Sequence, residues 1–563
     1  MKALLARAGP ALRYLSLEGF FRNLTNLHGA NARWLVPALE AAACFGLEEL
    51  WHGVVSSQQT EHLQLMFPRL RKGCLVISVD EAGASVEQAL TALPALQRRL
   101  KIAPPELGQL VAALQGPGQA AAPGVVQLTI APNDSVLWQN QQIGVPYTLD
   151  ADALPTALSA LPALHELSVF GCQLGMGHFA AVAARLLGSA SLRVLRLKRC
   201  GLTMANAVAA LTAPQLELLD LGFSPSLRLD DDDGSFAAAA GSHPTLRHLL
   251  LNHCDLTAAT VSALGAALEA SGTLHTLDLS STPSFRRGAE RFWHGLERNT
   301  SLRVLVLDRC ALDAAGARAA ARAIARQGRL ERLSLASNEV SDDGAVALAA
   351  LLQHKKCTLR DVILESNGIT GPGGVALATA LGRNTSLTAL DVSENQCGVP
   401  AAAKALAAAL AANKTLQVLR LAWWSLGGGA FAALARAAGA HPKLHLLDLS
   451  FNDVGDAGAR VFAAALERPG CALRTLLLND CNVGGGGARA LAKALRVNTT
   501  LRALMLRGND EINFGAFDAL RQAFRQHAAL RRLQLGPELP DLDREALEEH
   551  GGEEADADEE EGE

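Results

Sequence analysis

The sequence has little of several features that mark common functional classes. Aromatic residues make up 4% and charged residues 19% of its 563 positions. No apolar run is long enough to cross a bilayer. Arg7 and Arg13 interrupt the N-terminal stretch, and no small-residue cleavage site follows a clean apolar core, so it does not read as a secretory signal. We therefore expect a cytoplasmic protein, with the nucleus and the cilium as alternative locations.

Motifs that carry chemistry are also missing. The sequence has no phosphate-binding loop, G-x-S-x-G, H-E-x-x-H or C-x-x-C pattern. The glycine run at 484–487 lacks the Lys and Ser/Thr of a phosphate loop, and the 15 histidines are scattered. We therefore predict a protein that is not an enzyme, with no catalytic residues, no cofactor and no metal.

Leucine spacing is the dominant positive signal. Residues 301–312 read SLRVLVLDRCAL, which is the pattern L-x-x-L-x-L-x-x-C-x-L. Leu305 and Leu307 are two residues apart, so on a short strand they point to the same side. Leu302 and Leu312 lie in the flanking turns and fill the same interior. Such a unit cannot bury its own apolar side and needs copies of itself above and below.

The copies recur along most of the chain, in steps of 24 to 30 residues that are mostly 28 or 29. Between them lie Ala- and Leu-rich stretches with helical spacing. Each step has room for a strand, a loop, about three helical turns and a return loop. The first leucines of the cores are Leu164, Leu192, Leu216, Leu246, Leu274, Leu302, Leu330, Leu359, Leu387, Leu416, Leu444, Leu473, Leu501 and Leu530.

This pattern resembles the ribonuclease-inhibitor class of leucine-rich repeat proteins, over residues 161–535. That class also includes the repeat regions of NOD-like receptors and the Ran GTPase-activating protein. The resemblance implies an α/β leucine-rich repeat solenoid, or horseshoe, of 28–29-residue repeats. Its parallel β-sheet would line the concave face and its helices the convex face. A fold of this kind hosts many functions, so the resemblance does not name a partner.

Two residue types mark fixed positions in the repeat. Five of the ten cysteines occupy the place that Asn fills in other copies, so we predict stacked, buried, free thiols; they are Cys172, Cys200, Cys254, Cys310 and Cys481. Free thiols in such numbers suit a reducing compartment. The N-x-S/T matches at Asn299, Asn384, Asn413 and Asn498 recur at the helix-to-strand turn. We interpret them as repeat consensus and not as glycosylation sites.

We divide the chain into three parts. Residues 1–160 form a degenerate repeat region or a separate α/β cap. Expected strands there lie at 12–17, 47–50, 74–79 and 125–130, and expected helices at 31–44, 85–93 and 107–114. Residues 161–540 form the regular array. Residues 541–563 hold thirteen acidic residues and one arginine, so they carry −12 against −5 for the whole chain, and we predict a disordered tail.

Two repeats depart from the pattern. The repeat at Leu216 continues into an acidic run at 230–233, and the repeat at Leu274 continues into a loop with Arg286 and Arg287. Insertions in repeat proteins map to loops on one face, often a binding face. A tolerated surface loop is the alternative explanation.

Outward positions between the core leucines give the candidate binding surface. We single out Arg196, Asp278, Asp391, Arg420, Trp423, Asp448 and Phe451 as protein-binding residues. Trp423 and Phe451 are equivalent positions one repeat apart, so their rings should be close; exposed aromatics beside Asp and Arg are typical of binding hot spots. Alternatively, the two rings cover the strand ends. Trp424 fills the Asn/Cys position and should be partly buried. The other outward positions are Lys198, Asp220, Phe223, Met505 and Arg507.

We therefore predict a non-enzymatic scaffold or adaptor that captures a protein partner on the concave face. It would act as a monomer or as a subunit of a hetero-complex, without nucleic acid or membrane partners. One alternative is a GTPase activator like that for Ran, acting on a small GTPase through Arg286 and Arg287, which the resemblance and the acidic tail invite. Another is a structural subunit of a ciliary or cytoskeletal assembly.

Overall fold

The computed structural model describes residues 14–16, 49–52, 72–76, 97–102, 107–116, 125–131, 147–149, 152–174, 176–225, 234–535 and 542–543. Internal contacts divide the chain into two compact units, residues 1–278 (unit 1) and 279–563 (unit 2). This division differs from our three-part prediction, whose boundaries stay a prediction. The acidic run at 230–233, the expected helices at 31–44 and 85–93 and most of the acidic tail lie outside the described residues.

Unit 1 is built on parallel strands that pair in sequence order, joined where described by helices. The parallel pairings run from β1 to β5, then through β7 to β12. The strands are β1 (Tyr14–Ser16), β2 (Glu49–His52), β3 (Lys72–Val76), β4 (Gln97–Ile102), β5 (Val125–Ile130), β7 (Glu166–Phe170), β9 (Val194–Lys198), β10 (Leu218–Asp220), β11 (His248–Leu250) and β12 (Thr276–Asp278), with β6 (Tyr147–Thr148) and β8 (Cys172–Gln173) paired separately. The helices are α7 (Leu107–Gln115), α9 (Ala153–Ala160), α10 (Met176–Leu187), α11 (Met204–Ala210), α12 (Ser235–Ser242) and α13 (Ala258–Ala270).

Unit 2 repeats one strand and one helix with greater regularity. Its strands pair in parallel from β13 to β21, and only β22 runs antiparallel, against β21. The strands are β13 (Val304–Val306), β14 (Arg332–Ser334), β15 (Asp361–Ile363), β16 (Ala389–Asp391), β17 (Val418–Arg420), β18 (Leu446–Asp448), β19 (Thr475–Leu477), β20 (Ala503–Met505), β21 (Arg532–Gln534) and β22 (Leu542–Asp543). The helices are α14 (Phe285–Arg298), α15 (Ala314–Gln327), α16 (Ser341–Leu352), α17 (Gly371–Arg383), α18 (Pro400–Ala412), α19 (Phe431–Ala440), α20 (Gly455–Leu466), α21 (Gly485–Leu495) and α22 (Phe514–Gln526), with a short 3-10 turn at Gly428–Ala430.

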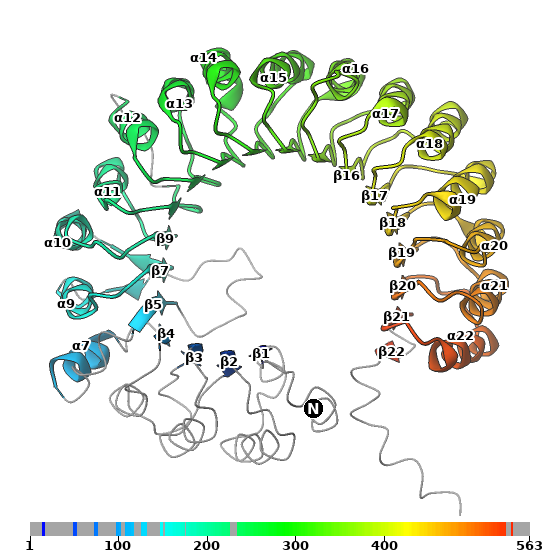
Figure 1. Cartoon of the computed structure of the whole chain (residues 1–563), viewed down its shortest axis with the longest axis horizontal. Helices are drawn as coiled ribbons and strands as arrows, with labels where there is room; N and C mark the ends of the chain where they lie inside the picture. Colours follow the sequence, from blue (N-terminus) through cyan, green and yellow to red (C-terminus); the bar gives the residue numbers. More distant parts are fainter. Residues whose placement is uncertain are drawn as a thin grey trace, which may run out of the picture. The chain divides into compact units, whose positions relative to one another are not determined.

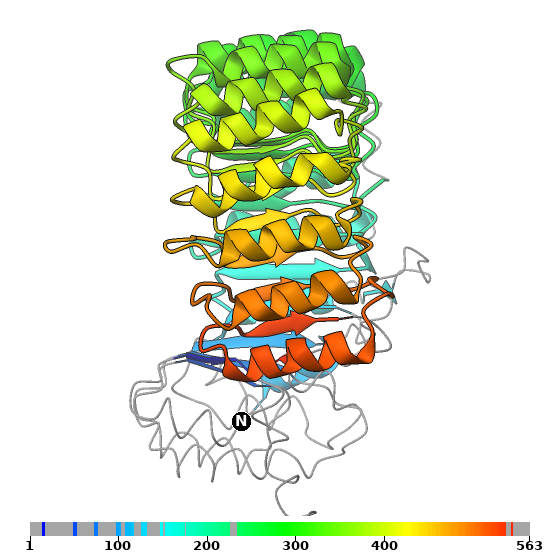
Figure 2. The ribbon, with the colours of Figure 1, turned by 90° about the vertical axis from the view of Figure 1, so that its right-hand side faces the viewer.

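The repeat leucines form the core between these two layers. Within unit 2 the strands lie on the inner, concave side and the helices on the outer, convex side (Figure 1). The helices stack side by side in nearly parallel rows (Figure 2). Leu305 and Leu307 are fully buried, as are Leu302 and Leu312 in the flanking turns. The α/β solenoid predicted from the leucine spacing is therefore confirmed.

Region 1–160 contains more strands than the sequence pattern indicated. Strands occur at or near each of the four expected places, and α7 lies where a helix was predicted. β4 was not predicted, because its sequence QRRLKI is mostly polar and basic. The parallel pairing from β5 to β7 joins this region to the first repeat of the regular array. The choice between degenerate repeats and a separate cap stays a prediction.

A row of asparagines and cysteines links successive repeats behind the strands. The Nδ2 group of Asn338 donates to the carbonyl oxygen of Leu307, one repeat earlier, at 2.8 Å. Cys310 fills the same position, and its Sγ donates to the carbonyl of Leu279 at 3.3 Å. Each residue thus satisfies a buried backbone carbonyl of its neighbour. The five predicted cysteines are buried and free, and burial raises the pKa of Cys254 and Cys481 to about 12, which keeps them protonated.

The N-x-S/T matches also have a structural role. At the end of α17, the Oδ1 atom of Asn384 accepts from the backbone N–H groups of Ser386 and Leu387, and its Nδ2 donates to Leu352 O. The helix-to-strand turn is therefore held by one buried side chain. His441 replaces Asn in this role at the end of α19. Its Nδ1 accepts from the N–H groups of Lys443 and Leu444 at 3.2 and 3.0 Å.

His441 makes unit 2 sensitive to acid. Burial lowers the pKa of its imidazole below the ordinary 6.5, so its stabilising contribution is present above pH 6.5 and is lost as the pH falls through the lowered folded-state value. We expect the wild-type protein to lose roughly 1 kcal/mol more unfolding free energy between pH 7.5 and 5.5 than His441→Asn, because Asn accepts the same two bonds without titrating. Urea unfolding at the two pH values measures this; an equal loss in both proteins would contradict it.

Candidate functional site

One position in the repeat carries the side chains of greatest interest. It lies just after each strand, directly before the buried Asn/Cys position, and its backbone is left-handed with φ near +55°. In unit 2 this position is held by Ser281, Arg309, Ser337, Ser366, Glu394, Trp423, Phe451, Asp480 and Gly508. Residues with a Cβ adopt this conformation at a cost of about 1–2 kcal/mol, so the packed repeat imposes it. The result is a row of side chains along the carboxyl edge of the sheet.

Trp423 and Phe451 stack within this row. Their ring centroids are 4.6 Å apart and the ring planes differ by 10°, so the predicted closeness of the two rings is confirmed. Both remain solvent-exposed, Trp423 at 54% and Phe451 at 39%. The pair therefore presents a flat apolar surface to solvent beside the strand ends.

Charged residues lie on the strands next to this stack. Arg420 of β17 is in register with Asp391 of β16 and Asp448 of β18. Its guanidinium is 3.8 Å from the Asp391 carboxylate. Both aspartates bend back at the strand end, where Oδ1 accepts from the N–H of Ser393 or Ser450. Five of the seven predicted binding residues are thus brought together on unit 2.

The surroundings of this cluster are acidic. Burial raises the pKa of Asp448 and Asp361 above the ordinary range, with Asp391 adding to the effect in both cases. Burial also raises the pKa of Glu365, and so do the neighbouring carboxylates Asp391, Glu394 and Asp308. Asp361 is paired with Arg332 at 3.1 Å, whereas at Glu365 burial and the nearby carboxylates outweigh the opposing effect of Arg309. This strip therefore has a local excess of negative charge that a cation would relieve. We call Trp423, Phe451 and these carboxylates the aromatic–acidic site.

The other two predicted binding residues, Arg196 and Asp278, lie on strands of unit 1. Arg196 on β9 forms an ion pair with Glu166 of β7. Asp278 on β12 is half-buried, opposite Leu250. The structure does not join them to the five residues of unit 2.

Four sequence-based expectations need correction. Asp220 does not face outward: it is buried, its Oδ1 accepts from Gly222 N, and its Oδ2 lies 2.9 Å from Lys198 Nζ. Asp391 and Met505, which were also expected to face outward, are likewise buried. Arg286 and Arg287 lie in the first turn of α14 and not in a loop. Arg286 is 2.8 Å from Asp313, which caps α15.

Trp424 is more deeply buried than expected, at 2% exposure, and its indole N–H has no hydrogen-bond partner within the described part of the chain. It stands where Asn395 stands one repeat earlier. The large ring therefore fills core volume at that repeat in place of the amide that links repeats elsewhere.

Sequence reasoning missed a second aromatic stack, in unit 1. Phe223 and His253 hold the same left-handed position, their rings are 4.5 Å apart, and the Arg199 guanidinium lies 5.2 Å from the Phe223 ring centroid. The sequence contained the information needed to find this stack, because each of the three residues stands directly before the Cys/Ser position of its repeat. Comparing that one position down all repeats would have found both stacks.

Comparisons with known proteins agree with this architecture. A family model described as "Leucine Rich repeat" matches residues 330–349, 355–378, 440–463 and 471–492. The ribonuclease inhibitor of Sus scrofa is 29% identical over 415 residues, which cover 72% of this chain and 89% of that protein. The chain is a ribonuclease-inhibitor-like leucine-rich repeat protein.

Other relatives are similar to this leucine-rich repeat protein over a smaller share of their own length. "NACHT, LRR and PYD domains-containing protein 12" of Mus musculus is 31% identical over 237 residues, 42% of this chain and 22% of that protein. An internalin structure from Listeria monocytogenes, 17% identical, covers 63% of this chain and 87% of the internalin with a TM-score of 0.37. Among the described residues, no helix could span a membrane and no cluster of His, Cys, Asp and Glu could hold a metal ion.

Proposed function

We propose that this leucine-rich repeat protein is a non-enzymatic scaffold that captures a protein partner at the aromatic–acidic site of unit 2. The observation that carries the proposal is the exposed Trp423–Phe451 stack, held beside the closely spaced carboxylates of Asp391, Glu394 and Glu365. Ribonuclease inhibitor, as its name states, acts on another protein, and its similarity to this chain supports a protein partner here.

The chemistry of the site suggests what the partner presents. A flat aromatic surface next to carboxylates suits a Lys or Arg side chain, whose charge interacts with the carboxylates and with the ring face. Arg420 lies 3.8 Å from the Asp391 carboxylate, and Arg309 offsets the negative charge at Glu365 only in part, so we place the partner's cation near Glu365 and Glu394. The partner segment is therefore a basic one with apolar neighbours. A cytoplasmic location is part of this proposal, because buried free thiols suit a reducing compartment.

Capture from cell extract tests the proposal. The bait would be the full chain, compared with Trp423→Ser/Phe451→Ser. Serine is chosen because Ser337 and Ser366 occupy the same left-handed position. The matched control is Phe514→Ser, which removes another exposed aromatic ring, 78% exposed, from α22 of the same unit. A protein retained by wild type and by the control but lost by the double variant is the expected result.

Equal capture by all three proteins would place binding elsewhere on the chain. Recovery of a small GTPase would favour the GTPase-activator alternative, in which case Arg286→Ala would need to abolish accelerated GTP hydrolysis. Recovery of axonemal or other cytoskeletal proteins would favour the assembly-subunit alternative.

A further inference from the structure

The amino edge of the sheet in unit 2, opposite to the aromatic–acidic site, carries a row of arginines. The residue after the first leucine of each repeat lies there, and neighbours are joined by backbone hydrogen bonds: Arg531 N to Arg502 O, and Arg502 N to Arg474 O, both 2.7 Å. The row continues in the same way back to Arg303. Its members are Arg531, Arg502, Arg474, His445, Gln417, Thr388, Arg360, Glu331 and Arg303.

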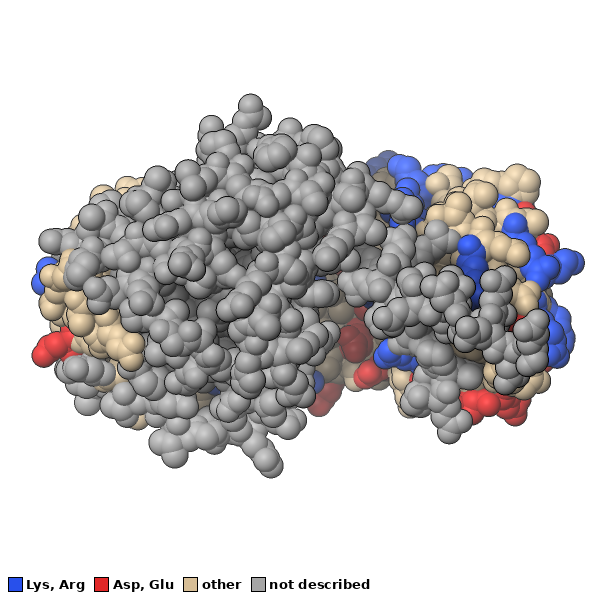
Figure 3. Space-filling model, turned by 90° about the horizontal axis from the view of Figure 1, so that it is seen from below, with Lys and Arg blue, Asp and Glu red and all other residues tan. Residues whose placement is uncertain are grey.

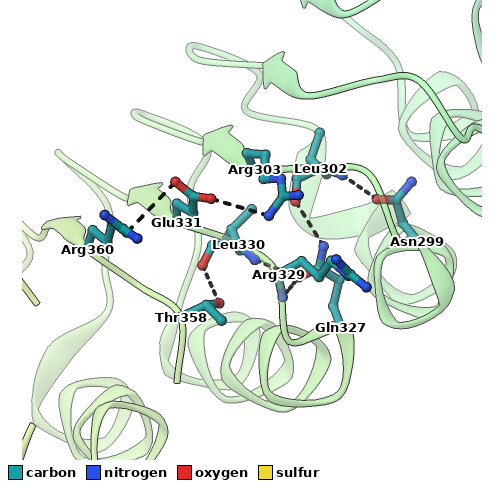
Figure 4. Close-up of polar contacts among 9 residues, drawn as sticks. All are labelled: Asn299, Leu302, Arg303, Gln327, Arg329, Leu330, Glu331, Thr358 and Arg360. Atoms are coloured by element: carbon teal, nitrogen blue, oxygen red, sulfur yellow. Dashed lines mark hydrogen bonds and ion pairs between the residues drawn. The ribbon is translucent and has the colours of Figure 1, made fainter. Parts of the chain in front are cut away.

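Part of this row forms a groove of about 530 Å³. Arg303, Arg329, Arg360 and Lys443 supply positive charge. Hydroxyl and amide groups come from Thr358, Thr385, Ser386, Thr388, Thr415 and Gln417. Glu331 is the one acidic lining residue, and it lies 3.3 Å from Arg303 and 4.0 Å from Arg360 (Figure 4). The groove therefore keeps a surplus of positive charge.

The arginines that lead to the groove are free to bind an anion. Arg474, Arg502 and Arg531 are exposed, and none of them forms an ion pair with any residue that the structure describes. Lys and Arg side chains gather around the last repeats of unit 2, on the right of Figure 3. The row is not evident in the sequence, because its neighbouring members are separated by 28 or 29 positions.

The end of the described chain points toward this edge. β22 runs antiparallel to β21, with Asp543 opposite Arg532 and Leu542 opposite Leu533. Asp543, the last described residue, therefore lies at the amino edge of the parallel strands, opposite Arg532. Residues 544–563 contain eleven acidic residues and one arginine.

Length permits the segment to reach the groove. Lys443 precedes β18, three strands from β21, and Arg360 precedes β15, six strands away. At about 4.8 Å per strand these distances are roughly 14 and 29 Å. Twenty residues span up to about 66 Å when extended.

We infer that the acidic segment 545–563 binds back along the arginine row into the groove of the same molecule. The segment supplies carboxylates where the row and the groove supply guanidinium and ammonium groups, and the antiparallel β22 starts it in the right direction. The binding is electrostatic, so it weakens as salt rises. Any other acidic ligand for this edge has to displace the segment.

Carbodiimide crosslinking of the full chain tests the inference, because the reagent condenses a carboxylate with a Lys amine in direct contact. At low ionic strength we expect an intramolecular link between Lys443 and a carboxylate of residues 545–563, identified by mass spectrometry. Its yield should fall about five-fold or more in about 0.5 M NaCl, and equally in Arg329→Ala/Arg360→Ala, which leaves Lys443 in place.

The matched control is Arg436→Ala/Arg489→Ala, which removes two exposed arginines from α19 and α21 on the helical side and should leave the yield unchanged. Three results would overturn the inference: no Lys443 link, equal loss in the two double variants, or links found only in covalent dimers. The last result would assign the groove to the tail of a second copy.

Discussion

Trp423→Ser is expected to weaken partner binding by at least 30-fold. This corresponds to a loss of about 2 kcal/mol of binding free energy, which is typical of truncating an anchor residue at the centre of an interface. The ring is 54% exposed in the free chain and already stacked on Phe451. It is therefore held in a binding geometry before the partner arrives, and little side-chain entropy is lost on association. Titration of the captured partner by isothermal calorimetry would measure the change.

The same variant should fold as well as wild type. Trp423 has a left-handed backbone, and Ser337, Ser366 and Gly508 occupy this position in other repeats. If the variant had an unchanged urea midpoint and an unchanged affinity, Trp423 would not be part of the interface.

Glu394→Gln tests the electrostatic contribution to partner binding. It should lower the affinity less than Trp423→Ser does, and it should make the affinity less dependent on salt concentration, because it removes one exposed carboxylate.

The repeat period was sufficient to predict which residues become neighbours. Trp423 and Phe451 are 28 positions apart, and a parallel ladder with one strand per repeat places them side by side. For the same reason the cysteine row could be predicted from Cys310 and Cys481. In a solenoid, residues that are one repeat period apart in the sequence lie next to each other across the sheet, so the period alone predicts these neighbours.

Orientation within a repeat could not be predicted in this way. Asp220 was assigned to the outer face because its place alternates with the core leucines. Its carboxylate instead turns back to the N–H of Gly222 and to Lys198, which buries it. A short polar side chain at a strand end can satisfy the backbone of the following turn, and leucine spacing contains no information about that choice.

The amino-edge groove was invisible for a different reason. Its cations come from Arg303, Arg329, Arg360 and Lys443, which belong to different repeats. Each one alone is an ordinary surface residue. Only the register of the repeats places them on one edge, and only the antiparallel pairing of β22 shows that the described chain ends at that edge.

Asn395→Ala is expected to cost about 3–5 kcal/mol of unfolding free energy, the largest stability effect we anticipate from a polar residue in unit 2. Its Oδ1 accepts from the N–H groups of Asn367 and Ile369 at 3.1 and 3.0 Å. Its Nδ2 contacts the carbonyls of Leu364, Val392 and Ser393, each at 2.9 Å. Alanine would leave these buried groups of two repeats without a partner, and no water can replace an amide that is 1% exposed without opening the stack.

Asn395→Cys should lose less, because Cys310 and Cys481 stand at this position and donate to the carbonyl of the preceding repeat. The exposed neighbour Gln396→Ala is the matched control and should change stability by less than about 0.5 kcal/mol. Urea unfolding followed by circular dichroism would rank wild type and Gln396→Ala highest, then Asn395→Cys, then Asn395→Ala. If Asn395→Ala and Gln396→Ala unfolded at the same urea concentration, the leucine core alone would hold neighbouring repeats together, and the asparagine row would only set their register.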